Sequence, residues 1–293
     1  LYKRIWTDEG SPLLVYTKKQ TELVRKSLQM LHPSIEVEYG MRYGTPSLES
    51  AIDKLIAAGC SKILLFNMYP HYSSTTVATN YDVVFKHLLK RRVVPTLRVA
   101  EPYFAHPEYI EALATTINEA YANMDPKPEK LVLSYHGIPE EYVQKGDTYC
   151  CHCAETTKAM VPKLHIPAEH VIHTYQSRFG KDPWLVPYSD ETIRELGEKG
   201  VKHIAVACPG FTSDCLETLD EMGHEGLEEF QESGGETLQL VPCLNDHPAW
   251  IEGMTKLIRK ELGSWLETAE RTGQQACKVA CPVLLAKQAA SGT

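Results

Sequence analysis

Short apolar runs alternate with amphipathic stretches along most of this chain of 293 residues. The runs have the length and composition of buried strands, and the stretches between them have helical spacing. The candidate strands lie at 34–42, 62–69 and 96–100, and then near Leu131, His170, His203 and Thr237. Because strands separated by helices build parallel sheets, the pattern predicts an α/β fold of two doubly wound domains with a cleft between them.

The segment DPKPEK, 125–130, is the best linker candidate, because it is short, polar and rich in proline. We therefore expect an N-terminal domain over 1–124 and a C-terminal domain over 125–246. A last helix, at about 247–268, is expected to pack back on the first domain. The tail, 269–293, has too little apolar periodicity to predict an element.

The overall charge restricts the class of partner. The formal net charge is −8, whereas phosphate backbones bind to basic surfaces, so nucleic acid is not expected as a partner. The sequence shows neither a signal peptide nor a run of about eighteen apolar residues, as a membrane-spanning helix requires. We expect a cytoplasmic protein, and leave open both peripheral contact with the inner membrane and the oligomeric state.

The stretch LVLSYHGIP, 131–139, joins a buried strand to a histidine. Its apolar run leads into Ser134, and His136 follows just before Gly137 and Pro139 end the strand. Ligands of open α/β sheets bind at the carboxyl ends of the strands. His136 is therefore a candidate active-site residue, although a lone histidine after a strand is more often an ordinary turn residue.

A second stretch, CPGFTSDCLETLDEM at 208–222, follows another apolar strand and predicts a helix. Asp214, Glu217 and Glu221 recur in it at spacings of three and four, which places all three carboxylates on one helical face. Most such faces are simply solvated. A histidine and a row of carboxylates that face one cleft would instead suit proton transfer and the handling of a divalent metal.

The nine cysteines do not form the dense framework of a small secreted domain. Cys150, Cys151 and Cys153 lie within four residues of one another. Such a cluster is typical of a metal site or of redox chemistry, and it also arises by coincidence. Cys277 and Cys281, near the C-terminus, could supply further ligands.

Taken together, the two stretches resemble the ferrochelatases, which insert ferrous iron into protoporphyrin to give haem. The pair SYHGIP and DCLETL is very specific to that family. The likeness extends over about 5–262 and includes, in the family's order, GSPLLVYT, MRYGTPSLESAI, YPHYSSTT, GDTY and QSRFGKDPWLVPYSDET. The resemblance implies two Rossmann-like domains of the chelatase type, which hold the porphyrin in the cleft between them.

The resemblance also implies roles for individual residues. His136 matches the family's active-site histidine, and Glu217 its acidic partner across the porphyrin. Asp214 and Glu221 match the acidic line that continues along the helix, so the residues implied to handle metal are His136, Glu217, Asp214 and Glu221. The positions that line or approach the macrocycle are Arg42, Tyr43, Tyr69, Pro139 and Trp184.

The reaction explains these residue types. Two central N–H protons must leave the porphyrin while the ferrous ion, a substrate, sheds water and enters. A histidine with an ordinary pKa of about 6.5 can accept a pyrrole proton. Carboxylates bind ferrous ion weakly enough to pass it on. Which side the iron enters from is open, because either His136 or the face near Arg42 and Tyr43 could handle it.

Three other functions fit parts of the pattern. A chelatase for another tetrapyrrole, coproporphyrin or sirohydrochlorin, would require a more cationic cleft. A solute-binding module with two such domains would be expected to carry a secretion signal. A non-catalytic porphyrin- or haem-binding protein would bind the macrocycle without inserting metal.

Two features depart from the family pattern. Family members normally have a strand and a long segment before the position of Ile5, which supply part of the porphyrin-facing lip; we expect that segment to be absent, which puts activity in question. Some ferrochelatases carry a 2Fe-2S cluster, in one group through a cysteine in the YP-x-Y-S loop, where this chain has Ser74. The hypothesis here is a cluster held by four thiolates among Cys150, Cys151, Cys153, Cys277 and Cys281, against unpaired thiols or a zinc site.

Overall fold

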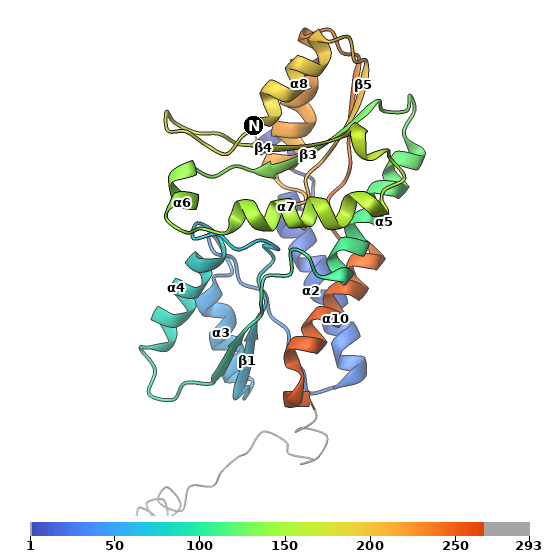
Figure 1. The fold of residues 1–293 in the computed structure, drawn as a ribbon. Coiled ribbons are helices and arrows are strands. Elements are labelled where there is room, and N and C mark those ends of the chain that lie inside the picture. Colours follow the sequence, from blue (N-terminus) through green and yellow to red (C-terminus); the bar gives the residue numbers. More distant parts are fainter. Residues whose placement is uncertain (1, 267–293) are drawn as a thin grey trace, which may run out of the picture.

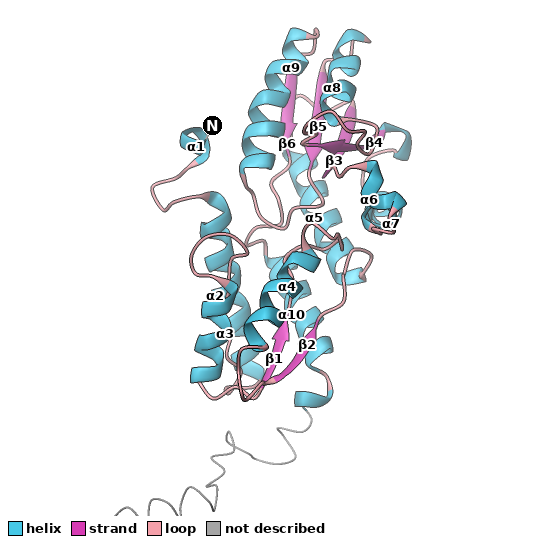
Figure 2. Cartoon of the chain, turned by 90° about the vertical axis from the view of Figure 1, so that its left-hand side faces the viewer, coloured by secondary structure: helices cyan, strands magenta, loops and turns pink. Residues whose placement is uncertain are grey.

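The computed structural model describes residues 2–266, and two parallel sheets form its framework (Figures 1 and 2). The elements of the first half are α1 (Tyr2–Ile5), α2 (Pro12–Leu31), α3 (Leu48–Ala57), β1 (Lys62–Leu65), α4 (Val77–Leu88), β2 (Thr96–Val99) and α5 (Pro107–Asn123). Those of the second half are β3 (Lys130–His136), α6 (Glu140–Gln144), α7 (Tyr149–Met160), η1 (Val161–Lys163), η2 (Ala168–His170), β4 (Val171–Gln176), α8 (Ser189–Glu198), β5 (His203–Ala207), the π-helix η3 (Glu217–Glu225), α9 (Gly226–Glu232), β6 (Thr237–Leu240) and α10 (Pro248–Leu262). The predicted α/β fold with parallel sheets is confirmed.

The larger sheet has the strand order β4-β3-β5-β6, and each neighbouring pair is parallel. On one face, Leu131, Leu133 and Tyr135 of β3 belong to a core shared with α5, α7 and α10. On the other face, Val132 packs with α8, η3 and α9. Because side chains alternate along a strand, His136 lies on the same face as Val132. The sheet therefore directs His136 toward the helix that carries the predicted carboxylates.

The smaller sheet consists, within the described residues, of β1 and β2, which pair from Lys62 with Thr96 to Leu65 with Val99. The strand predicted over 34–42 is wrong, since residues 34–40, all of them described, belong to no strand. The α2 helix satisfies their carbonyls instead. Arg25 donates to the carbonyl of Val37 at 3.1 Å, and Gln29 to that of Ile35 at 3.0 Å. The alternating apolar residues thus belong to an extended segment that packs on the core beside α2.

The two halves share one core. Helix α10 contacts both α2 and α5 (Figure 1). A single hydrophobic cluster extends from Val24 in α2 through Ile117 in α5 to Leu257 in α10. The hydrophobic core therefore continues from the first half of the chain into the second, past the domain boundary predicted at residue 124. The domain limits inferred from the linker stay a prediction.

Candidate active site

His136 ends β3 and lies near two aromatic rings. Its ring centroid is 6.5 Å from that of Trp184 and 6.4 Å from that of Phe211. Nδ1 lies 2.7 Å from the carbonyl oxygen of Gly137, so in the neutral ring Nδ1 carries the proton and donates it there. That contact leaves the lone pair of Nε2 available, and His136 is chemically suited to accept a proton.

Trp184 is held against the end of β3 by a close backbone approach. Pro139 and Trp184 form an isolated antiparallel bridge, and the Leu185 N–H donates to the carbonyl of Ile138 at 3.1 Å. A Cβ at Gly137 would lie 3.0 Å from Cε3 of Trp184, so only glycine lets the indole ring pack there without displacement. Three residues predicted from the sequence, His136, Pro139 and Trp184, are therefore neighbours.

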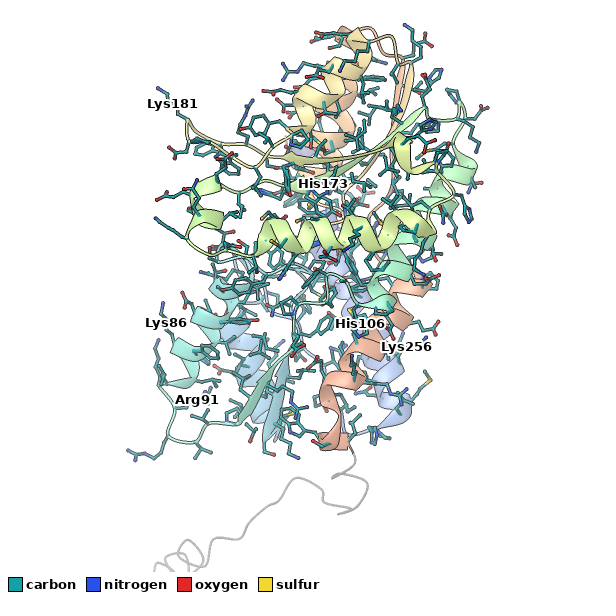
Figure 3. All side chains as sticks on the ribbon, viewed as in Figure 1. Lys86, Arg91, His106, His173, Lys181 and Lys256 are labelled. Carbon is teal, nitrogen blue, oxygen red and sulfur yellow. The ribbon has the colours of Figure 1, made fainter. Side chains whose placement is uncertain are left out.

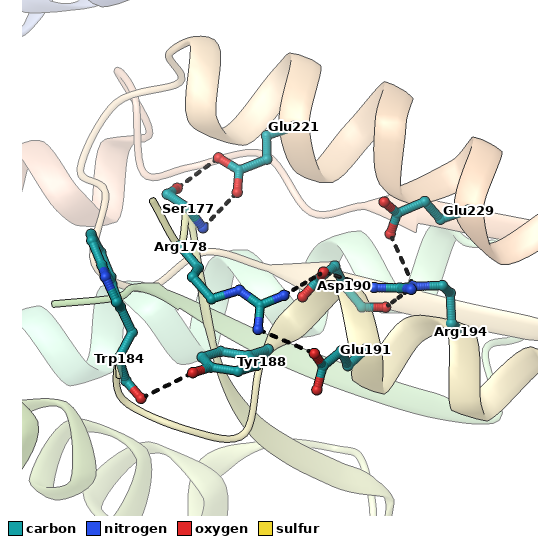
Figure 4. Close-up of polar contacts among 9 residues, drawn as sticks. All are labelled: Ser177, Arg178, Trp184, Tyr188, Asp190, Glu191, Arg194, Glu221 and Glu229. Atoms are coloured by element: carbon teal, nitrogen blue, oxygen red, sulfur yellow. Dashed lines mark hydrogen bonds and ion pairs between the residues drawn. The ribbon is translucent and has the colours of Figure 1, made fainter. Parts of the chain in front are cut away.

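Glu221 lies in η3, and the end of β4 binds its carboxylate. The N–H and the hydroxyl of Ser177 donate to it at 2.7 and 2.6 Å (Figure 4). Gln176 Nε2 also donates to it, at 3.2 Å. Burial raises the pKa of the Glu221 carboxyl, while the donors from Ser177 and Gln176 and the nearby His136 act against that rise. Glu221 and His136 therefore belong to one electrostatic environment.

Asp214 does not lie on the face that the spacing predicts. It precedes η3 and is 5% exposed. Its carboxylate accepts from Asn245 Nδ2 at 2.6 Å, from the Thr218 hydroxyl at 3.1 Å and from the Cys243 N–H at 3.3 Å. The prediction that three carboxylates share one helical face is wrong for Asp214, because its contacts hold it in the loop before the helix.

The other predicted porphyrin-lining positions lie in the first half of the chain. Tyr69 follows β1, and partial burial together with the charge of Glu217 raises the pKa of its hydroxyl. The guanidinium of Arg42 lies 4.4 Å from the ring centre of Tyr43, and Tyr43 is 74% exposed. Both residues also act electrostatically on Tyr69. The pKa of the Tyr69 hydroxyl thus responds to charges from both halves of the chain, raised by Glu217 and lowered by Arg42.

Helix α7 divides the cysteine cluster. The Sγ atoms of Cys150 and Cys151 are 3.9 Å apart near its start, and Cys151 is exposed. Cys153 is fully buried beside Tyr149, and burial raises the pKa of its thiol well above the usual value. Cys277 and Cys281 lie outside the described residues. Within residues 2–266, no three His, Cys, Asp or Glu side chains converge as metal ligands do.

Sequence reasoning missed Gln176, Ser177 and Phe211. Gln176 pairs with His136 across the sheet and binds η3. The sequence did offer a sign of Gln176 and Ser177. They form a polar pair directly after the apolar strand near His170, and the carboxyl end of that strand is expected beside the end that carries His136.

The ferrochelatase family model matches residues 1–262. The chain belongs to the ferrochelatase family. It is 46% identical to the ferrochelatase of Brucella ovis over 268 residues, which are 91% of this chain and 76% of that protein. It is also 46% identical to the ferrochelatase of Mesorhizobium japonicum over 267 residues, 90% of this chain and 75% of that one.

Solved chelatases share the fold of this ferrochelatase-family chain. SirB from Bacillus subtilis with Fe³⁺ superposes with a TM-score of 0.59 at 14% identity, over 85% of this chain and 91% of that one. CbiX, described as the terminal enzyme of sirohaem biosynthesis in denitrifying bacteria, superposes with a TM-score of 0.54 at 13% identity, over 86% and 94%. At such low identity the likeness shows the fold alone, and it confirms the predicted chelatase-like architecture.

Proposed function

We propose that this chain is a lyase-type metal chelatase that inserts ferrous iron into protoporphyrin IX and releases protohaem, the last step of haem synthesis. The observation that carries the proposal is the position of His136. Its Nδ1 is committed to the Gly137 carbonyl, its ring lies near those of Trp184 and Phe211, and its charge lowers the pKa of the Glu221 carboxyl. A proton acceptor, aromatic walls and a carboxylate helix thus meet at the carboxyl ends of the strands.

The two pyrrole N–H protons leave as Fe²⁺ enters, so the ring charge changes from neutral to the dianion that binds the metal. His136 takes a pyrrole proton at Nε2. Glu217 and Glu221 relay protons away or escort the ferrous ion, since hard carboxylates hold it loosely. The described residues offer no preformed three-ligand metal set, which favours transient contacts with the ion over a resident site. Asp214 belongs to the acidic line as a support for the start of η3, through its contact with Thr218.

The macrocycle is proposed to bind with Trp184 and Pro139 on one side and Tyr69 on the other. Apolar walls that grip a bent ring lower the barrier, because bending exposes the nitrogen lone pairs to the metal. Arg42 and Tyr43 approach the edge of the ring, where a guanidinium can pair with a propionate carboxylate. The Nε of Arg42 is buried without a hydrogen-bond partner among the described residues, which supports that role.

The test is anaerobic incubation of the purified protein with ferrous iron and, in parallel, protoporphyrin, coproporphyrin and sirohydrochlorin. We expect the protoporphyrin bands to convert to those of haem faster than either alternative converts. Preferred conversion of another tetrapyrrole would replace protoporphyrin as the substrate. Tight binding of all three without conversion would point to a non-catalytic porphyrin-binding protein.

We further propose a 2Fe-2S cluster held by Cys150, Cys151, Cys277 and Cys281. Cys150 and Cys151 fit this role because their thiols adjoin near the surface, whereas Cys153 does not fit, because it is fully buried in the core. When bound, such a cluster would supply a redox-active group held by four thiolates. Visible absorbance of anaerobically purified protein, with iron and sulfide analysis, tests it: an absence of both elements overturns the cluster, and zinc alone would identify a zinc site.

A cytoplasmic location with peripheral contact to an anionic membrane completes the proposal. Every helix within residues 2–266 falls short of the length or apolarity that a bilayer crossing needs. In the segment that follows α4, Leu89 is 83% and Val93 81% exposed. Lys86 and Arg91, which are labelled in Figure 3, are their neighbours in the sequence. Apolar side chains interleaved with cations suit an anionic surface. Flotation with anionic and neutral vesicles tests this. Equal recovery of the protein with the two kinds of vesicle would rule out this surface. Wild-type recovery of the Leu89→Ser and Val93→Ser variants with anionic vesicles would rule it out as well.

A further inference from the structure

The end of β4 binds the first turn of η3 directly. Gln176 is 3% exposed, and its Nε2 donates to the carbonyl oxygen of Glu217 at 2.8 Å and to Glu221 Oε2 at 3.2 Å. Ser177, whose φ is 63°, adds two donors to the same carboxylate. Figure 4 shows Ser177 directed at Glu221, whereas the Arg178 side chain points away toward Asp190 and Glu191. The strand that pairs with β3 at His136 therefore also holds the carboxylate helix.

The other end of the Gln176 amide contacts a buried chain of hydroxyl groups. Its Oε1 accepts from the Ser134 hydroxyl at 2.8 Å. The Ser134 Oγ lies 2.7 Å from Ser189 Oγ, which lies 2.8 Å from Thr174 Oγ1, and all three residues are fully buried. The carbonyl of Glu217 can only accept, so Nε2 must face η3, and Oε1 is left to face the hydroxyl groups.

A side-chain donor at the Glu217 carbonyl competes with the amide that would close an α-helical turn there. Side chains inserted into the i→i−4 ladder are a known cause of local departures from the α-helix, and π-helical turns are rare outside such places. The carbonyl that Gln176 binds belongs to the first residue of the π-helix. The geometry therefore connects the amide of Gln176 with the unusual form of η3.

We propose that Gln176 is a positioning residue that keeps η3 in its π form and so sets where Glu217 and Glu221 lie relative to His136, a role that rests on the proposed iron insertion. The amide nitrogen of Gln176 contacts η3, and no side-chain hydrogen bond joins Gln176 to Trp184 or Tyr69 within the described residues. Loss of its amide should therefore impair turnover more than porphyrin binding.

The test compares Gln176→Met, which keeps the volume and removes the hydrogen bonds, with the wild type. We expect kcat for iron insertion to fall about 10- to 100-fold, as displaced catalytic groups commonly cause, and KM for the porphyrin to stay within about threefold. Hydrogen exchange of the amides of η3 should accelerate in the variant even without substrate, while those of β3 and β5 stay protected. Gln176→Glu retains an acceptor for Ser134 but turns an oxygen toward the Glu217 carbonyl, so it should show the same loss.

Gln239→Met is the matched control. Gln239 donates to the carbonyl of Pro126 at 2.9 Å, so the change removes a comparable bond away from η3, and kcat should not change. Wild-type kcat and wild-type exchange of η3 in both Gln176 variants would overturn the role of Gln176. If the wild type itself inserts no iron but exchange of η3 still accelerates in Gln176→Met, the proposed function fails while the control of the helix by Gln176 stands.

Discussion

The carboxylate of Asp147 binds Ser74 twice, accepting from its backbone N–H at 2.7 Å and from its hydroxyl at 2.8 Å. The same oxygen accepts from the hydroxyl of Ser73 at 3.0 Å, and the other oxygen accepts from the N–H of Tyr149 at 3.0 Å. Asp147 is 8% exposed. One carboxylate therefore ties the loop that follows Tyr69 to the start of α7, which carries the cysteine cluster.

Replacing Asp147 with alanine should lower the free energy of unfolding by about 3 kcal/mol, because buried donors lose a charged acceptor and none replaces it. Urea denaturation measures the change. Asp182→Ala, at an exposed position, is the control and should cost less than about 0.5 kcal/mol. Equal stability of the two variants would mean that water satisfies the donors of the loop.

Gly137→Ala should disturb the packing of Trp184. The added Cβ would lie 2.9 Å from the Gln176 carbonyl oxygen and 3.0 Å from the indole ring, and overpacking of this kind costs about 1–3 kcal/mol. We expect weaker porphyrin binding, measured by quenching of tryptophan fluorescence. Gly210→Ala is the matched control, since its Cβ would meet atoms no closer than 3.7 Å; if both variants bind porphyrin equally, Trp184 is not a wall of the site.

Buried His71 and partly buried His173 should make the fold sensitive to acid. Burial lowers the pKa of His71 to about 3 and that of His173 to about 4. The unfolded chain, with histidine pKa values of about 6.5, binds more protons than the folded one below that pH, so stability is full above about 6.5 and declines as the pH falls toward 4. At pH 5 each histidine should cost about 2 kcal/mol.

Urea denaturation of the wild type at pH 7.5 and pH 5 measures this decline. His71→Gln removes one titrating group and should make the decline shallower. His165→Gln, at an exposed position, should leave it unchanged. A decline that is equally steep in His71→Gln would exclude His71 as a source of the acid sensitivity.

The parallel sheet and the place of His136 could be predicted from the sequence, because an apolar run that ends in polar residues and glycine leaves few alternatives. The extended segment 34–40 could not. Its alternating residues match a strand, and only the positions of Arg25 and Gln29 in the tertiary structure determine what satisfies its carbonyls. The alternation of apolar and polar residues along a segment indicates which side chains are buried. It does not indicate which groups form hydrogen bonds with the backbone.

The carboxylate helix shows a second limit. A spacing of three from Asp214 to Glu217 assumes that the helix already includes Asp214, whereas contacts with Asn245, distant in sequence, hold Asp214 outside it. The π form of η3 could likewise not be predicted from the sequence, because it involves the side-chain amide of Gln176 on another strand. Glu221 was predicted as a member of the site, but its donors Gln176 and Ser177 become evident only when β4 lies beside β3.

The most direct test of the account is the comparison of wild type and His136→Ala in single-turnover iron insertion, with porphyrin binding followed in the same samples. We expect the variant to bind protoporphyrin with nearly unchanged affinity and to insert iron about 10²- to 10⁴-fold more slowly, the usual loss of a positioned proton acceptor. His165→Ala, an exposed histidine, should behave as the wild type. Wild-type insertion by His136→Ala would contradict the central claim that this histidine accepts the pyrrole proton.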